Sequence, residues 1–224
     1  MNGLLLINKP LGITSFDVIR VLRRQTSVRK IGHAGTLDPL ASGLMLMLFG
    51  TACKQASSLS GLDKRYVAQI TLGATSTTGD GEGEKTPVSD IQPTFDEIEL
   101  ALVGLTGEIT QVPSIYSAIK INGQEAYKRA RAGETVDMPS RQVTVYQNTV
   151  VRYAYPIIEL ETHVSSGTYV RSLASDLGAE LGTGAYLSGL VRTDVGPYSL
   201  RDALVLDEAN VAATAQHMRD VTGV

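Results

Sequence analysis

The chain has 224 residues, enough for one well-packed core, and its hydrophobic and charged fractions are ordinary for a globular protein. The net charge of −3 gives no overall preference for a polyanionic partner, and its apolar runs all fall short of the ~20 residues that a membrane-spanning helix needs. Cys53 is the only cysteine, which excludes an internal disulfide; with no signal-peptide pattern at the N-terminus, we expect a cytoplasmic protein.

The pattern along the chain predicts short strands interleaved with helices. Residues 4–8 are an apolar strand, a Pro/Gly turn follows at 9–12, and Thr14 with Asp17 has the spacing of a capping box that begins a helix. The further predicted elements are a loop at 31–43, strands at 44–49 and 66–72, a loop at 73–83, helices at 95–103 and 124–132, strands at 143–151 and 157–164, and helices at 170–181 and near 207–221. Such interleaving predicts an α+β, or mixed α/β, fold built on one large sheet, in a single domain over residues 1–224.

The charged residues are unevenly distributed. Residues 80–108 carry −7, which leaves +4 for the rest of the chain. The basic residues form two groups, one of Arg20, Arg23, Arg24, Arg29 and Lys30, and the other of Lys120, Lys128, Arg129, Arg131 and Arg141. Phosphate binding depends on local positive potential, because screening acts within about 8–10 Å. Charge alone nevertheless favours two solvated basic faces.

Several well-known site motifs are absent from the sequence. It contains no Gly-x-x-x-x-Gly-Lys segment, its alternating glycines at 79–83 do not have dinucleotide-binding spacing, and no serine has the flanking glycines of a nucleophile elbow. The three histidines are far apart, so we expect no metal site. Acid, base or carboxylate chemistry without a cofactor remains.

Residues 32–43 are the most informative segment. Pro39 biases Asp38 toward an extended backbone, three glycines permit close approach of another molecule, and Leu37 and Leu40 would be buried and brace the loop. A carboxylate held in this way is suited to act as a base, a nucleophile, a metal ligand or a turn cap. Taken alone, the pattern favours the turn cap.

Residues 32–43 resemble the catalytic motif of the TruB-type tRNA pseudouridine synthases, which isomerise uridine 55 in the TΨC arm of tRNA. Four further segments resemble motifs of that family in the same order, namely residues 6–15, residues 63–66 with 72–75, residues 112–120, and the pair 166–173 and 190–193. Five ordered motifs make the resemblance specific. It implies a pseudouridine synthase fold, with one large, mixed and mostly antiparallel sheet flanked by helices, and an RNA-binding insertion at about 111–138.

The resemblance assigns catalytic roles to three residues. Asp38 matches the aspartate that attacks the target nucleotide before the N-glycosidic bond is cleaved, the base rotates and rejoins through C5. Tyr66 matches the tyrosine that stacks on the target base and takes the C5 proton. Arg171 matches the basic residue that pairs with the aspartate, where a cation favours the ionised carboxylate.

Substrate-binding roles follow in the same way. Leu190 resembles an apolar residue that packs on the target base, Tyr169 is expected to line the same pocket, and His33 matches the histidine that enters the space left by the flipped base. Lys9 is expected to support the active-site loop. The expected phosphate contacts are Lys64, Lys120, Lys128, Arg129 and Arg131.

The resemblance further implies an isomerase that acts on the TΨC stem-loop of tRNA as a monomer, without a metal or an organic cofactor. Family members commonly continue into a C-terminal PUA-type module, which we do not expect in this chain because too few residues follow the last motif. One alternative is a non-catalytic RNA-binding or RNA-folding protein on the same scaffold. Another is an unrelated carboxylate hydrolase, which would need a second catalytic acid.

Overall fold

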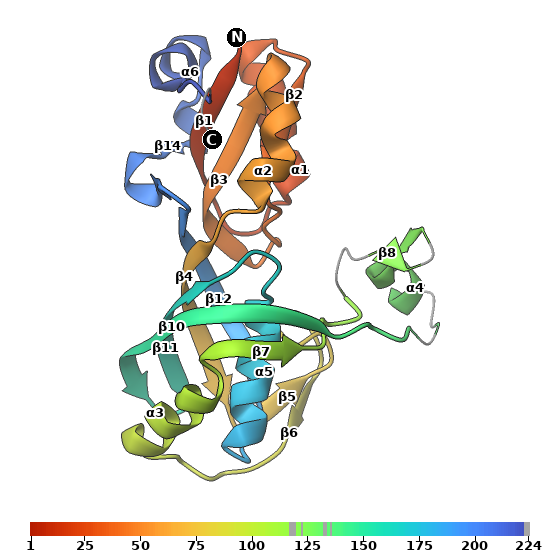
Figure 1. The fold of residues 1–224 in the computed structure, drawn as a ribbon, viewed down its shortest axis with the longest axis vertical. Coiled ribbons are helices and arrows are strands. Elements are labelled where there is room, and N and C mark those ends of the chain that lie inside the picture. The colour runs from red at the N-terminus through yellow and green to blue at the C-terminus, as the bar shows by residue number, and fades with distance from the viewer. Residues whose placement is uncertain (117–119, 122, 132–133, 135, 222–224) are drawn as a thin grey trace. The chain divides into compact units, whose positions relative to one another are not determined.

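A computed structural model describes residues 1–116, 120–121, 123–131, 134 and 136–221, and its contacts divide the chain into two compact units (Figure 1). The first unit comprises Met1–Val67 and Leu190–Val224, and the second comprises Ala68–Gly189. The sequence has no linker-like segment at these boundaries. A single catalytic domain over residues 1–224 stays a prediction.

Ten strands of the described residues belong to one mixed sheet. They are β1 (Gly3–Lys9), β2 (Ile31–Ala34), β3 (Ala41–Phe49), β4 (Lys64–Leu72), β7 (Gly107–Gln111), β10 (Arg141–Ala154), β11 (Ile157–Val164), β12 (Ala185–Val195), β13 (Tyr198–Ser199) and β14 (Leu204–Val205). Their order is β14-β1-β3-β12-β4-β11-β10-β7, with β2 on β3 and β13 on β12. Pairing is mostly antiparallel, with parallel pairs at β1–β14 and β3–β12. The predicted fold class is therefore confirmed.

The strand register of the first unit aligns three residues side by side. Lys9 on β1 pairs with Gly43 on β3, and Gly43 pairs with Arg192 on β12. Residues that face each other across neighbouring strands project to the same side of the sheet. The long basic side chains of Lys9 and Arg192 therefore lie on either side of Gly43, which has no side chain.

Helices of the first unit cover this sheet. They are α1 (Ser15–Thr26), α2 (Ala56–Ser60) and α6 (Val211–His217), with short 3-10 helices at Gly50–Gln55, Leu200–Asp202 and Leu206–Glu208. The predicted capping box is confirmed, because the Thr14 hydroxyl accepts from the Asp17 N–H at 3.1 Å and the Asp17 carboxylate accepts from the Thr14 N–H at 2.9 Å. Helix α1 buries Val18, Ile19 and Leu22 in the same core cluster as alternate residues of β1 and β3.

The second unit is built on the long antiparallel pair β10–β11, beside which β7 lies. Helix α3 (Phe95–Gly104) begins at residue 95, as predicted, and Thr94 forms a capping box with Glu97; α5 (Val170–Glu180) buries Leu173 and Leu177. Two small hairpins, β5 (Ala74–Ser76) with β6 (Lys85–Pro87) and β8 (Lys120–Ile121) with β9 (Gln124–Glu125), and helix α4 (Ala126–Arg131) complete the unit.

Several predicted boundaries were wrong. The expected loop at 73–83 contains strand β5, and the helix expected at 124–132 begins only at Ala126, because residues 124–125 form strand β9. The expected loop at 31–43 contains strand β2, because Ile31 pairs with Phe49 and continues the sheet. The strand expected at 44–49 begins at Ala41, where residues 41–43 pair with β12. The helix expected near 207–221 is confined to α6 and is capped by Asn210, whose side chain accepts from the Ala213 N–H at 3.0 Å.

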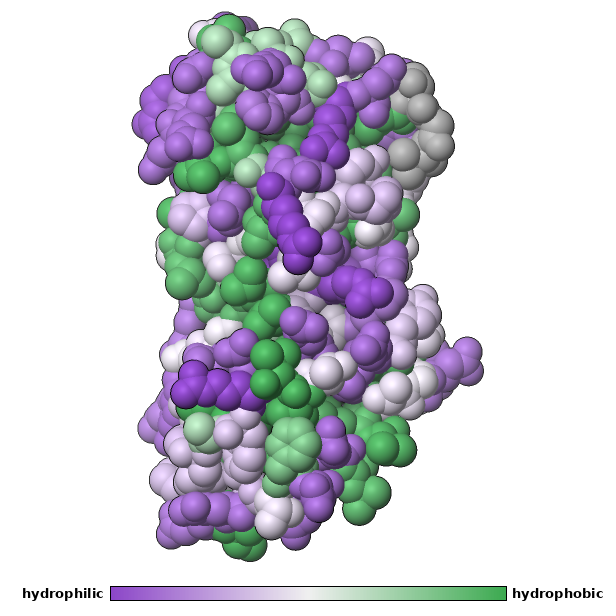
Figure 2. Space-filling view, turned by 90° about the vertical axis from the view of Figure 1, so that its left-hand side faces the viewer, coloured by the Kyte–Doolittle hydropathy of each residue, from purple (hydrophilic) through white to green (hydrophobic). Residues whose placement is uncertain are grey.

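The surface is mixed in character. Figure 2 shows one face of the molecule, on which hydrophobic residues are interspersed with hydrophilic ones. Among the described residues, each helix is too short or too polar to cross a bilayer.

Candidate active site

Asp38 lies on the loop between β2 and β3, and its side chain is exposed. Both of its neighbours are fixed by the α1 segment. The Ser15 hydroxyl donates to the Leu37 carbonyl and accepts from the Leu37 N–H, each at 2.8 Å, and the Gly12 N–H donates to the Pro39 carbonyl at 2.8 Å. Leu37 is buried, as predicted, whereas Leu40 is only half-buried. The loop therefore presents Asp38 to solvent from a backbone that is held on both sides.

Arg192 fixes the same loop from the interior of the first unit. Its side chain is 1% exposed, and its guanidinium donates to the carbonyls of Leu44 at 2.7 Å, Gly35 at 3.2 Å and Thr36 at 3.4 Å. Burial lowers the pKa of Arg192, and its electrostatic interaction with the Tyr66 phenol opposes that change. One buried cation thus bonds to the start of the Asp38 loop and to the strand that follows it.

Gly43 makes room for this arrangement. Its φ of +101° is unfavourable for other residues, and a Cβ built on it would overlap the backbone nitrogen and carbonyl oxygen of Arg192. Gly43, the third glycine of the motif, is therefore required because β12 approaches β3 closely at this position. It makes room for a strand of the protein itself, whereas the sequence suggested room for another molecule.

Lys9 is fully buried, and its ammonium donates to the carbonyls of Pro10 at 2.9 Å and Ile13 at 2.8 Å. Burial lowers the pKa of Lys9 to about 8; the Asp38 carboxylate opposes this change and the Arg192 cation adds to it. These contacts tie together the turn that precedes α1. They fit the predicted supporting role, and a direct contact with substrate stays a prediction.

Tyr66 and Leu190 are half-buried and pack against the same core cluster of the first unit. His33 is also half-buried; its Nδ1 has no hydrogen-bond partner in the structure, and burial, with a smaller contribution from Arg192, lowers its pKa. Lys64 is buried, with its ammonium bonded to the carbonyls of Ser60 and Leu62. Its Nζ therefore faces the protein in this structure, and its phosphate contact stays a prediction.

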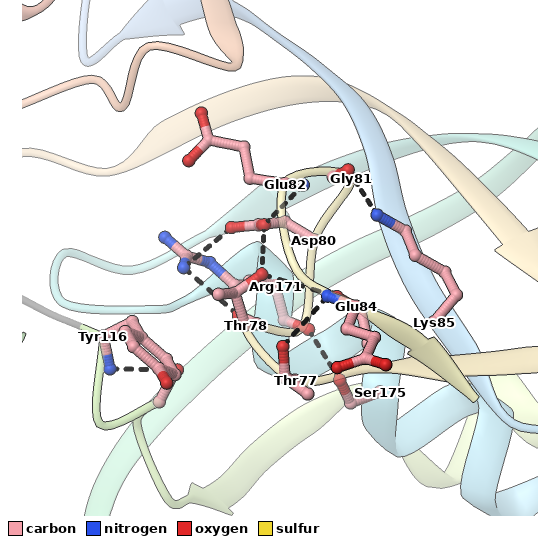
Figure 3. A network of polar contacts seen from close by, with 12 residues as sticks. Thr77, Thr78, Asp80, Gly81, Glu82, Glu84, Lys85, Tyr116, Arg171 and Ser175 are labelled. Carbon is pink, nitrogen blue, oxygen red and sulfur yellow. Dashed lines mark hydrogen bonds and ion pairs between the residues drawn. The ribbon is translucent and has the colours of Figure 1, made fainter. Parts of the chain in front are cut away.

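Arg171 belongs to the second unit, where it forms an ion pair with Asp80 at 2.8 Å (Figure 3). The Asp80 carboxylate also accepts from the Thr78 hydroxyl at 2.5 Å and from the Glu82 N–H at 3.0 Å, and Arg171 donates to the Thr78 carbonyl at 3.2 Å. Figure 3 shows Arg171 beside the loop that carries Thr78 and Asp80. The predicted pairing of Arg171 with Asp38 joins residues of different units and stays a prediction.

Tyr169 immediately precedes α5 and is half-buried. Its N–H donates to the Gln111 side chain at 3.0 Å, and the Gln111 amide donates back to the Tyr169 carbonyl at 3.3 Å. The guanidinium of Arg141 lies 5.2 Å from the centre of its ring. These contacts fix Tyr169 against β7, and its expected place in the substrate pocket stays a prediction.

The predicted RNA-binding insertion, residues 111–138, is partly described. Ala126, Val136 and Met138 form a small core of their own, Lys128 is exposed, and Arg129 forms an ion pair with Glu134 at 2.7 Å. The side chains of Lys120 and Arg131 lie outside the described residues. Across the described part of the chain, no group of three or more metal-ligating side chains is found.

Sequence comparison gives the family. Residues 23–170 match the TruB family pseudouridylate synthase (N terminal domain). The chain belongs to this family. It is 46% identical over 210 residues to the tRNA pseudouridine synthase B of Corynebacterium efficiens, covering 92% of this chain and 71% of the relative, and 44% identical over 220 residues to that of Thermobifida fusca, covering 92% and 74%. The resemblance found in the five motifs is confirmed.

Solved structures confirm the pseudouridine synthase fold of this TruB-family chain. A crystal structure of a Cbf5-Nop10-Gar1 complex matches with a TM-score of 0.73 and 28% identity, over 92% of this chain and 52% of that chain. An H/ACA RNP bound to a substrate RNA containing 2′-deoxyuridine matches with a TM-score of 0.69 and 26% identity, over 92% and 51%. The chain therefore spans about half the length of these two solved proteins.

Two buried groups of the TruB-family site were not predicted from the sequence. Arg192 lies within the motif at 190–193, but no role had been assigned to it. Asp80 was counted only as part of the acidic segment, although it stands between two glycines in a Thr/Gly-rich loop, a setting similar to that of Asp38. The glycine-rich loop around Asp80 was the one available signal in the sequence. The contacts of Arg192 with Leu44 and of Arg171 with Asp80 join residues far apart in the chain, so sequence spacing does not report them.

Proposed function

We propose that this chain isomerises uridine to pseudouridine in the TΨC arm of tRNA, at position 55, as a cytoplasmic monomer. The observation that carries the proposal is the exposed Asp38 on a loop held by Ser15, Gly12 and the buried Arg192. A nucleophile must be accessible to the substrate and fixed in position, since a displacement of about 1 Å can cost a hundredfold in rate. Names of curated relatives support tRNA as the substrate.

In the proposed reaction the target uridine leaves its stack, and the Asp38 carboxylate attacks the nucleotide. The N-glycosidic bond breaks, the base rotates, a bond forms from C5 to the ribose, and the bond between Asp38 and the nucleotide breaks, which returns the free carboxylate. The proton on C5 is then lost and one is gained at N1, so the product is an isomer of the substrate. The sequence of steps is redox-neutral, and a carboxylate is an established covalent nucleophile.

Tyr66 and Leu190 would contact the flipped base. Both pack on one core cluster and leave part of their surface open, and the Tyr66 phenol interacts electrostatically with the buried Arg192. A flat aromatic ring and an apolar side chain suit the two faces of a base. Tyr66 would take the C5 proton, and His33 would occupy the space that the base leaves in the RNA.

Arg171 would keep Asp38 ionised, in addition to its pairing with Asp80. A guanidinium has five N–H donors and can serve two carboxylates. Lys128 and Arg129, with Lys64, Lys120 and Arg131, would contact phosphates and so position the RNA without reading its sequence.

The decisive experiment incubates the protein with an unmodified tRNA transcript and maps pseudouridine. We expect formation at the TΨC position by wild-type protein and by Asp207→Asn, a control at an exposed acid. Asp38→Asn should bind the transcript nearly normally and form no product. Tight binding without isomerisation by the wild type would instead identify a non-catalytic RNA-binding or RNA-folding protein. A large loss of binding in Asp38→Asn would show that Asp38 is mainly structural.

A further inference from the structure

The surface beside Asp38 contains two exposed apolar side chains. Leu11 is 63% exposed and Phe16 is 50% exposed. Each is the immediate sequence neighbour of a residue that bonds to the Asp38 loop, since Gly12 contacts Pro39 and Ser15 contacts Leu37. Leu11 and Phe16 are therefore exposed on the segment that holds the Asp38 loop.

Phe16 is already paired with a cation. The guanidinium of Arg20 lies 4.9 Å from the centre of the Phe16 ring, and the Asp17 carboxylate holds it in place at 2.8 Å. Asp17 is itself fixed by the capping box. The Arg20 side chain remains 66% exposed, so its remaining donors are available to a ligand.

The positive charge continues along α1. Residues buried on this helix are Ser15, Val18, Ile19, Leu22 and Thr26. Phe16, Arg20, Arg23 and Arg24 follow one another at the spacing of a single helix face, opposite the buried stripe, and span roughly 12 Å. In the part of the chain that the structure describes, no ion pair engages Arg23 or Arg24.

A purely structural explanation accounts for only part of this surface. Basic residues in the last turn stabilise a helix through its dipole, which explains Arg23 and Arg24. It does not explain an exposed phenylalanine under an arginine, or an exposed leucine, at the edge of a nucleophile-bearing loop. Aromatic rings next to basic side chains are the combination that binds unpaired nucleotides, with bases on the rings and phosphates on the cations.

We propose that the α1 face, made of Leu11, Phe16, Arg20, Arg23 and Arg24, binds the RNA strand that flanks the target uridine. An unpaired base next to the target packs on Phe16 and Leu11, and the three arginines bind phosphates of the same strand. This inference rests on the proposed function, because the substrate strand has to pass over the surface around Asp38. It adds a contact surface in the first unit to those expected in the insertion.

The test measures dissociation constants for an unmodified TΨC stem-loop RNA over a range of salt concentrations, in the Asp38→Asn background so that the RNA is not converted. Phe16→Ala should weaken binding about tenfold with an unchanged salt slope, because a stacking contact releases no counterion. Arg20→Gln should reduce the slope of log K against log salt by about 0.7–0.9. Arg20→Lys, which keeps the charge, should restore the slope.

Two matched controls separate this surface from general effects. Phe95→Ala removes an exposed phenylalanine that also lies at the start of a capped helix, and Arg152→Gln removes an exposed arginine on β10. Both should bind like the parent. Thermal unfolding of every variant confirms folding, and Phe16→Tyr provides an aromatic variant that should bind normally.

Binding by Phe16→Ala and Arg20→Gln equal to that of the two controls would overturn the inference, while product formation by wild-type protein would leave the proposed function standing. Failure of wild-type protein to form pseudouridine would refute the function, and the binding data would still decide on the surface. The inference would also be overturned if these variants lost only binding to phosphatidylserine vesicles, since the face would then be a membrane contact.

Discussion

The guanidinium of Arg171 and the carboxylate of Asp80 lie 2.8 Å apart, and the two side chains are only 9% and 2% exposed. Breaking a buried ion pair by removing one of its charges costs about 3–5 kcal/mol. We therefore expect Asp80→Asn to lower the free energy of unfolding in urea by that amount, even though the amide can still accept from Thr78 and Glu82. The exposed Asp90→Asn is the control. Equal stability of the two variants would show that the pair contributes little.

The electrostatic interaction between Arg192 and Tyr66 gives a second prediction. Lysine keeps the charge but cannot reach the carbonyls of Gly35 and Leu44 together. Arg192→Lys should lower the free energy of unfolding by about 2–4 kcal/mol, as expected for lost hydrogen bonds to a buried charged group. A double-mutant cycle with Tyr66→Phe should give a coupling of about 0.5–3 kcal/mol, whereas a cycle with Phe95→Ala, at an exposed residue of the other unit, should be additive. Additivity in both cycles would contradict a shared network.

The sequence correctly predicted those helices and strands whose formation depends on neighbouring residues in the chain. The Thr14 capping box, the helix beginning at 95, the strand at 157–164 and the helix beginning at 170 follow from side-chain spacing and were confirmed. Strand β2 was missed because its four residues have no periodic pattern and are recruited by pairing with β3.

The site was predicted in the same uneven way. Asp38 and Tyr66 were assigned catalytic roles because they lie in motifs that resemble a family, and these roles stay predictions. The clamp by Arg192 joins positions about 150 residues apart, as its bond to the Leu44 carbonyl shows, and no spacing rule reports such a contact. Lys64 shows the converse, since a lysine in a matched motif was expected at the surface and is buried on two carbonyls.

Substitution of a glycine can be unfavourable because of backbone strain or because the new Cβ overlaps a neighbour, and three glycines differ in which of these applies. Gly12 has a positive φ of +84° with open space around it, Gly178 has no such φ but a Cβ there would overlap Ala185, and Gly43 combines both. We expect Gly12→Ala to cost about 1–2 kcal/mol, from strain alone. Gly43→Ala should cost clearly more than Gly12→Ala, and should also lower turnover because β12 carries Arg192. Unfolding in urea measures the first effect and pseudouridine formation the second; a Gly43→Ala protein as stable as Gly12→Ala would contradict the close approach.

Lys9 makes stability depend on pH in the alkaline range. Burial lowers its pKa from 10.5 in the unfolded chain to about 8 in the folded protein. Between these values the unfolded chain binds a proton that the folded chain does not, so the free energy of unfolding rises with pH; below about pH 8 both states bind it and the dependence ends.

Lys9→Met removes this titration, so its gain in unfolding free energy between pH 7.5 and pH 10 should be smaller than that of wild type by about 1–3 kcal/mol. Lys64→Met should behave similarly, because burial also lowers the pKa of Lys64 to about 8. Lys54→Met, at an exposed lysine, should keep the wild-type gain. Lys9→Met also leaves the Pro10 and Ile13 carbonyls without their donor, at every pH. Comparing the change in unfolding free energy between the two pH values, and not its absolute value, removes this constant cost. A Lys9→Met gain equal to that of Lys54→Met would mean that Lys9 stays protonated in the folded protein throughout this range.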